Sequence, residues 1–176
     1  MATDNAGFPA LKPALITRIH VDPTKIRPFG VSHTGSSLIH FEVPSGTVET
    51  VPGFEPEFKA EIVFGGDWFV MDADGKHGRV NFRGIAKTDD GHVIDIRTFG
   101  TVDMVPAAAK VFTLQPDMAS VPFGHAAARI EYLVNDPKPK FLENSFLVGN
   151  AQVIIDETGV TIENRQSIVL TPTIQE

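Results

Sequence analysis

Frequent turn-forming residues divide this chain into short segments and leave little room for long helices. Thirteen prolines and fifteen glycines are spread over 176 residues. In most segments between them, apolar residues alternate with polar ones, which is the period of a β-strand with one buried face. The pattern predicts strands at 14–21, 37–43, 46–51, 57–64, 67–72, 79–87, 92–99, 126–134, 146–155 and 159–169.

Turn sequences are expected to join these strands into hairpins. The clearest is TDDG at 88–91, where Gly91 supplies the positive φ that a tight turn requires, and DETG at 156–159 is similar. GGDW at 65–68 is interpreted as another reversal, with Asp67 accepting hydrogen bonds from the amides of its own turn. The segment PKPKFLENSF has helical spacing after a proline-limited start, which predicts one short helix near 138–145.

Many short strands and tight turns favour an all-β fold. We expect a single antiparallel β-barrel of about eight to ten strands, because closure removes the edges that so many strands would otherwise expose. A two-sheet sandwich is the alternative. The length fits a single domain over residues 1–176, with 1–12 and 171–176 as loose ends.

Composition and charge exclude several classes of function. The net charge is −7 and the basic residues are scattered, so nucleic acid is not an expected partner. The chain has no cysteine, no long apolar run and no export signal at its start, which favours a cytoplasmic protein that does not enter a membrane. The six histidines form no metal-binding motif and no glycine-rich phosphate loop occurs, so neither a metal nor a cofactor is expected.

Two neighbouring strands carry polar residues that share a face. Asn81 and Arg83 share one face of 79–87, and Asp95, Arg97 and Phe99 share one face of 92–99. Pairing of these strands would gather them around an arginine–carboxylate contact. This cluster is either a solvated salt bridge or a ligand-facing patch, and strand parity alone does not decide. If Arg97 points inward, exposed isoleucines on the other face would allow a homodimer.

Two further positions are candidates for proton transfer or ligand contact. His40 shares a strand face with Glu42, and a histidine beside a carboxylate exchanges protons near neutral pH. Trp68, the single tryptophan, follows Asp67 and could stack on a flat ligand at a barrel mouth. The alternatives are an ordinary surface or core histidine and a structural turn with an anchoring aromatic.

The order of the motifs resembles a family of small β-barrels known as domain of unknown function 3237. The resemblance rests on GGDW at 65–68, DG at 74–75, Arg83, TDDGHVIDIRTFG at 88–100 and DPKPKFLENSFLVGNAQV at 136–153, and it spans most of 14–169. In the family pattern an acid precedes the arginine and a WLN helix precedes FVG. Here Asn81 replaces that acid, and Glu143 occupies the position of the helical asparagine. The resemblance implies a lipocalin-like or allene-oxide-cyclase-like barrel whose mouth holds small apolar molecules, without implying a reaction.

Two functions fit these observations. The first is a cofactor-independent isomerase, cyclase or lyase acting on a small apolar oxygenated metabolite, polyketide-like or terpenoid-like, by acid–base chemistry. The second is a carrier or sensor that binds a similar molecule without converting it. The apolar segment 101–125 would serve as a lid in either case. The candidate catalytic residues are Arg83, Asp67, His40 and Glu143, and the candidate ligand-binding residues are Trp68, Arg97, Asp95, Asn81, Phe99 and Tyr132.

Overall fold

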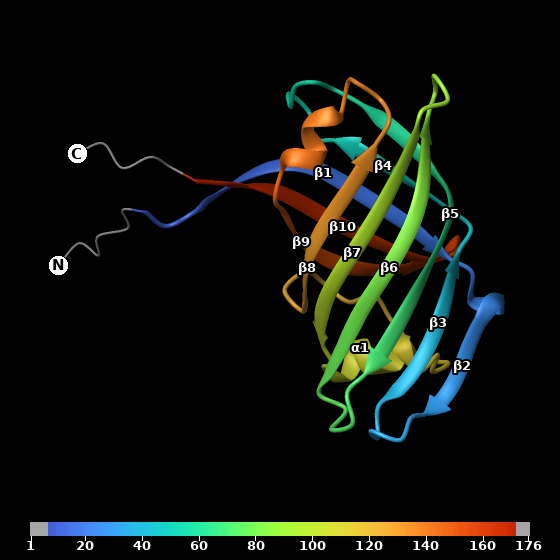
Figure 1. Cartoon of the computed structure of the whole chain (residues 1–176). Coiled ribbons are helices and arrows are strands. Elements are labelled where there is room, and N and C mark those ends of the chain that lie inside the picture. The colour runs from blue at the N-terminus through green and yellow to red at the C-terminus, as the bar shows by residue number, and fades with distance from the viewer. Residues whose placement is uncertain (1–6, 172–176) are drawn as a thin grey trace.

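A computed structural model describes residues 7–171 of the chain, and ten strands make up most of it (Figure 1). The strands are β1 (Ala10–Val21), β2 (Ile26–Val31), β3 (Ser37–Val43), β4 (Ser45–Thr50), β5 (Lys59–Met71), β6 (His77–Thr88), β7 (Val93–Asp103), β8 (Ala126–Val134), β9 (Leu147–Asp156) and β10 (Gly159–Leu170). One α-helix and two short 3-10 helices complete the described elements: α1 (Pro106–Phe112), η1 (Pro23–Lys25) and η2 (Lys140–Asn144). None of the described helices is long and apolar enough to cross a membrane.

Eight antiparallel strands close into a barrel, and two more lie outside it. The order around the barrel is β5-β4-β1-β10-β9-β8-β7-β6, and pairing between β6 and β5 closes the ring. The hairpin β2–β3 is added to the lower part of β5 (Figure 1), since Gly65–Met71 pairs with β3 while Lys59–Ile62 pairs with β4. The closed all-β barrel predicted from the alternating pattern is therefore confirmed.

The GGDW segment lies inside one continuous strand and does not reverse the chain. Residues 57–64 and 67–72, predicted as two strands, belong together to the thirteen-residue β5. Neither Gly65 nor Gly66 has a positive φ. A Cβ at Gly65 would lie 3.0 Å from the ring of Phe82, and one at Gly66 would lie 2.5 Å from Nε2 of His40. These glycines therefore allow close packing on both faces of the sheet, and the interpretation as a turn was wrong.

Other predicted boundaries also change. The predicted helix near 138–145 is the 3-10 helix η2, while the described α-helix, α1, lies within 101–125 and begins at Pro106. The strand β2 was not predicted, because five of its six residues are exposed and no apolar alternation marks it. Residues 10–12, expected to be loose, belong to β1. The parts of the predicted loose ends at 1–6 and 172–176 lie outside the described residues. The predicted glycine turns are confirmed by positive φ angles of 83° at Gly91 and 119° at Gly159.

The barrel interior is filled at one end and lined by aromatic rings at the other. At the end covered by η2, the interior holds a core of fully buried side chains such as Ile94 and Leu142. At the opposite end α1 lies across the opening (Figure 1). There the ring of Phe112 stacks on Phe69 with centroids 4.1 Å apart, and Phe41 meets Phe112 edge-on at 5.9 Å. Helix α1 thus covers the open end through apolar contacts.

Candidate functional site

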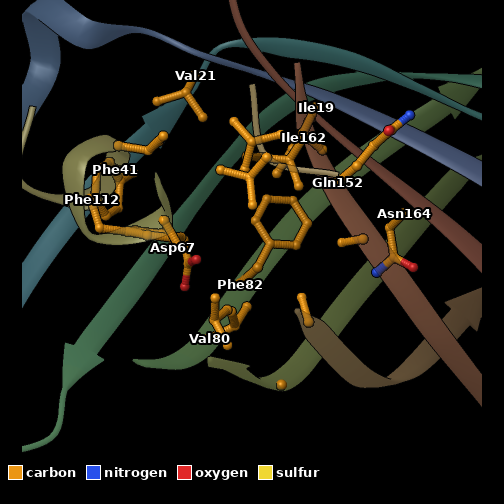
Figure 2. Close-up of a pocket in the computed structure, with 18 of the residues that line it drawn as sticks. Ile19, Val21, Phe41, Asp67, Val80, Phe82, Phe112, Gln152, Ile162 and Asn164 are labelled. Carbon is orange, nitrogen blue, oxygen red and sulfur yellow. The ribbon is translucent and has the colours of Figure 1, made fainter. Parts of the chain in front are cut away.

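An internal cavity of about 130 Å³ lies between the packed core and α1 (Figure 2). Cavities of about this size hold a single benzene-sized molecule. The walls are mostly apolar side chains from the strands and from α1, including Ile19, Phe41, Phe82, Phe112 and Ile162. Among the described residues that line it, Asp67 and His125 are the ionisable ones, and none is a lysine or arginine.

Asp67 places a carboxyl group in this apolar cavity (Figure 2). One of its oxygens, Oδ1, accepts a hydrogen bond of 2.8 Å from the backbone N–H of Asn81. Burial raises the pKa of Asp67 to about 7, and the hydrogen bond from Asn81 opposes that rise only in part. Asp67 therefore exchanges between its neutral and charged forms near neutral pH.

The backbone around Asp67 explains why its side chain is held in place. The β5–β6 ladder pairs Asp67 with Phe82 and Val70 with Arg79 in the same register, with a gap between these two pairs. The N–H of Asn81 lies in that gap, and the carboxylate of Asp67 is its acceptor. The carboxyl group thus replaces a backbone acceptor that the ladder lacks at this point, and it also lines the cavity.

A second polar feature of the interior is a buried chain of hydrogen bonds on β8, β10 and β1. The hydroxyl of Tyr132 donates to Oε1 of Gln166 at 2.7 Å, and Nε2 of Gln166 donates to the hydroxyl of Thr17 at 2.8 Å. Burial raises the pKa of Tyr132 to about 12, so this phenol stays protonated. Gln166 and Thr17 line the cavity, whereas Tyr132 lies behind them.

The predicted arginine–aspartate cluster forms, and it lies on the outer surface. Nε of Arg83 contacts Oδ1 of Asp95 at 3.0 Å, and Arg97 contacts Oδ2 of the same carboxylate at 3.0 Å. The two arginine side chains are 62% and 44% exposed. Ile94 and Ile96, on the other face of β7, are buried in the barrel. The expectation that an inward Arg97 leaves isoleucines exposed was therefore wrong, and the homodimer that it would allow stays untested.

His40 and Trp68 also lie on the outer face, on the paired strands β3 and β5. Their rings meet edge-on with centroids 4.7 Å apart, and Trp68 is 44% exposed. Burial, followed by the charge of Arg27, lowers the pKa of His40. Glu42, expected to act with His40, binds Lys25 instead at 2.8 Å. The inward neighbours on these strands are Phe41 and Asp67, so His40 and Trp68 do not reach the cavity.

The remaining predicted residues are distributed around the outside and the far end. Glu143 in η2 accepts the N–H of Val134 at 2.7 Å and pairs with Lys140 at 2.8 Å. Phe99 lies under the guanidinium of Arg129 at 5.0 Å. Asn81 contributes its backbone N–H to Asp67. Of the ten residues that the sequence suggested, the structure places Asp67 in the cavity wall and the others elsewhere.

Residues that sequence reasoning missed come mainly from β10. Asn164 and Gln166 follow Val160 and Ile162 on the inward face, and all four line the cavity. The signal was present as polar side chains that continue an apolar alternation. Attention to histidine, acidic and arginine positions alone passes over such neutral amides.

One group of potential metal ligands gathers outside the cavity within the described residues. Atoms of Asp72, Asp74 and His77 lie within 4.8 Å of one another in the turn between β5 and β6. The carboxylate of Asp72 already accepts hydrogen bonds from Nε of Arg79 at 3.1 and 3.2 Å. This ion pair accounts for the position of Asp72 without an ion.

The fold and the site together define a small antiparallel β-barrel with a covered, apolar internal cavity and one carboxyl group in its wall. The chain belongs to the family described as protein of unknown function (DUF3237), whose model matches residues 9–167. No curated protein matches it.

Solved structures with the same fold come from bacteria and a fungus. A conserved protein of unknown function from Rhodopseudomonas palustris is 17% identical with a TM-score of 0.75, covering 93% of this chain and 99% of that one. A beta-barrel like protein from Acinetobacter baumannii AYE is 18% identical with a TM-score of 0.68, covering 95% and 99%. A protein described as an enzyme from Penicillium herquei is 14% identical with a TM-score of 0.59, covering 95% and 99%. At these identities the likeness is one of fold.

Proposed function

We propose that this protein is an enzyme that moves a proton within a small, largely apolar, oxygenated metabolite held in its barrel cavity. The observation that carries the proposal is the carboxyl group of Asp67, which faces an apolar cavity and has its pKa raised to about 7. A group with this pKa acts as base and as acid at neutral pH, which isomerisation, cyclisation and elimination all require. The enzyme would be an isomerase, a cyclase or a lyase that uses no cofactor.

The proton transfer is balanced without a further reactant. The Asp67 carboxylate takes a proton from a carbon beside a substrate carbonyl, or from a hydroxyl, and the carboxyl group formed returns that proton to another atom of the same molecule. Bonds to hydrogen are broken and formed in equal number, and Asp67 ends in its starting state. In an elimination the atom that receives the proton belongs to the leaving group, whose bond to carbon breaks as the carbon–carbon double bond forms. In a cyclisation the ring bond forms as a π bond of the substrate is lost. The hydrogen bond from the N–H of Asn81 to Oδ1 holds the group in one orientation during both steps.

The lining changes the roles that were expected of the arginines. Arg83 and Arg97 lie on the outer surface, and no arginine or lysine lines the cavity among the described residues. Negative charge that develops on the substrate would therefore be met by neutral hydrogen-bond donors of the cavity wall. This arrangement suits a substrate whose reactive oxygen gains charge only transiently.

A structural relative supports the proposal at the level of the fold. The Penicillium herquei protein is described as an enzyme and shares the barrel with a TM-score of 0.59. A barrel of this kind is therefore compatible with catalysis, although fold alone does not define a reaction.

The second candidate is a carrier or sensor that binds the same kind of molecule without converting it. The specific observation in its favour is the apolar wall, in which Asp67 and His125 are the ionisable members among the described residues. In this case the raised pKa of Asp67 would keep the cavity nearly neutral for an apolar ligand.

Exchange of hydrogen for deuterium distinguishes the two functions and does not require the natural substrate. Small cyclic ketones such as cyclohexenone and indanone are incubated with the protein in D₂O, and deuterium at the carbons beside the carbonyl is followed by NMR. We expect the unmodified protein to accelerate exchange, and Asp67→Asn to bind the ketones equally well with exchange at the background rate. The asparagine keeps the acceptor for the N–H of Asn81, so the fold is preserved. Binding with no acceleration in the unmodified protein would support the carrier.

A further inference from the structure

Asn164 carries a side-chain amide inside the barrel that has no hydrogen-bond partner among the described residues. It lies on the inward face of β10 and lines the cavity, and its Oδ1 is buried without a partner. Figure 2 shows the amide nitrogen turned toward the middle of the cavity. An amide offers both a donor and an acceptor, so either orientation presents an unused hydrogen-bonding group.

The neighbouring amide on the same strand face, Gln166, differs from Asn164 in its hydrogen bonding. Gln166 uses both ends of its side chain, accepting from Tyr132 at 2.7 Å and donating to Thr17 at 2.8 Å. The interior therefore satisfies one buried amide fully and leaves the next one open. A buried polar group without a partner is unfavourable unless something supplies one.

The backbone of β9 is shaped to hold Asn164 where it lies. A Cβ added at Gly149 would overlap Oδ1 of Asn164. Gly149 thus leaves space for the amide against the strand, and an alanine there would displace it. The amide oxygen of Asn164 therefore packs against β9, which leaves the amide nitrogen as the group that faces the cavity.

Asn164 and Asp67 lie on different sides of the cavity. Asp67 is on β5 and Asn164 is on β10, which are separated by β4 and β1 in the ring of eight strands. Figure 2 shows the two side chains on opposite sides of the Phe82 ring. A ligand that reaches Asp67 with one part can therefore meet Asn164 with another.

The charges around the cavity restrict the ligand further. No lysine or arginine lines it in the part of the chain that the structure describes, and Asp67 itself becomes negative on ionisation. A carboxylate or phosphate would enter an apolar space that has no lysine or arginine in its wall among the described residues, and the charge of Asp67 would lie nearby. Anionic ligands are thus disfavoured both by the apolar surroundings and by repulsion from the ionised Asp67.

We propose that the ligand is an uncharged apolar molecule with a carbonyl or hydroxyl oxygen that hydrogen-bonds to the amide of Asn164, at a position away from the atom that exchanges its proton with Asp67. This inference rests on the proposed function, in that Asp67 marks the reacting end. It adds the substrate class, a neutral ketone, enol or phenol, and it assigns Asn164 as the residue that selects for the second oxygen.

Phenol and toluene test the role of Asn164 because they have the same shape and differ by a hydroxyl against a methyl group. Their dissociation constants are measured by calorimetry for the unmodified protein and for Asn164→Leu, which keeps the side-chain size. We expect the ratio of the toluene constant to the phenol constant to fall about tenfold in Asn164→Leu, the value of about one neutral hydrogen bond. Thr98→Val is the matched control, since it removes another cavity-lining hydroxyl, and it should leave the ratio unchanged.

Three outcomes overturn the inference: an unchanged ratio in Asn164→Leu, loss of the ratio in Thr98→Val instead, or tighter binding of benzoate than of toluene. The melting temperature of the unliganded protein gives an independent readout. It should rise in Asn164→Leu if the amide is kept for a ligand, and a fall would show a structural role.

The ratio of the toluene constant to the phenol constant is also measured in Asp67→Asn, where it should persist. If the protein prefers phenol through Asn164 but does not accelerate ketone exchange, the proposed function is contradicted and this inference stands. If it accelerates ketone exchange but the phenol preference does not depend on Asn164, this inference is contradicted and the proposed function stands.

Discussion

The sharpest consequence of the buried carboxyl group is an inverted dependence of stability on pH. Most aspartates have a lowered pKa in a folded protein and so stabilise it at neutral pH. Asp67 has its pKa raised from 3.8 to about 7, so the folded state holds a proton that the unfolded state releases between these values. Stability is therefore greatest below the unfolded pKa and falls as pH rises toward 7.

The magnitude follows from the shift. A rise of about three pKa units corresponds to about 4 kcal/mol in total at about 1.4 kcal/mol for each unit. Between pH 5 and pH 8 the two titration curves give a loss of about 2.5 kcal/mol in the free energy of unfolding. For a domain of this size that is roughly 5–10 °C in melting temperature.

The assay compares the unmodified protein with Asp67→Asn by urea denaturation at several pH values. The asparagine keeps an oxygen for the N–H of Asn81 but cannot ionise, so the difference between the two proteins isolates the titration of Asp67. His40, whose lowered pKa makes stability rise with pH, is present in both and cancels. The free energy of unfolding of Asp67→Asn, minus that of the unmodified protein, should increase by about 2.5 kcal/mol between pH 5 and pH 8. The same change at Asp89, exposed in the turn between β6 and β7, is the control.

A difference that stays constant from pH 5 to pH 8 would refute the reasoning. It would mean that Asp67 ionises in the folded protein as easily as in the unfolded chain. The carboxyl group would then be in contact with bulk water, and the apolar cavity could not tune it for proton transfer.

Three further substitutions test the packing around the cavity. Gly78→Ala should lower the free energy of unfolding in urea by about 1–3 kcal/mol, because the added Cβ would overlap the ring of Phe69. An unchanged free energy of unfolding would show that the ring can move aside. Phe112→Ala should lower the free energy of unfolding by about 2 kcal/mol and speed ligand entry in stopped-flow binding, because it removes the ring that stacks on Phe69 at 4.1 Å. Unchanged entry rates would argue against α1 as the cover of the cavity. Arg83→Ala should change the free energy of unfolding by less than about 1 kcal/mol and leave ketone exchange intact, because its ion pair with Asp95 is exposed. Loss of exchange would show that the reaction takes place on the outer face of the barrel.

The fold could be predicted because alternation and turn chemistry act locally. The segments at 37–43 and 126–134 were predicted with the boundaries that the structure has, and the glycines at 91 and 159 take the expected conformation. The boundary at Gly65 failed because glycine serves two purposes. It permits reversal, and it permits close approach of a neighbouring ring, and only the packing of Phe82 and His40 shows which purpose applies.

The site was harder to predict because strand parity does not say which face is inside. Phe82 and Ala86 on β6 are buried, and this places Arg83 on the other face. Asp67 shares the inward face of β5 with Phe69, but dividing that strand at GGDW concealed the pattern. A carboxylate that continues an apolar face is the signal to look for once the strand is recognised as continuous.

The two open polar groups in the cavity argue that the hollow is kept for a ligand and is not a packing defect. A defect in an apolar core is lined by apolar atoms, and its polar neighbours are satisfied, as the chain from Tyr132 through Gln166 to Thr17 is. Asp67 and Asn164 instead direct an ionisable group and an unpaired amide into the same space from different strands. Each lowers the stability of the fold, and replacing either polar side chain by an apolar one of similar size would remove its penalty. A ligand that bonds to Asp67 and to the amide of Asn164, as we propose, would offset both penalties.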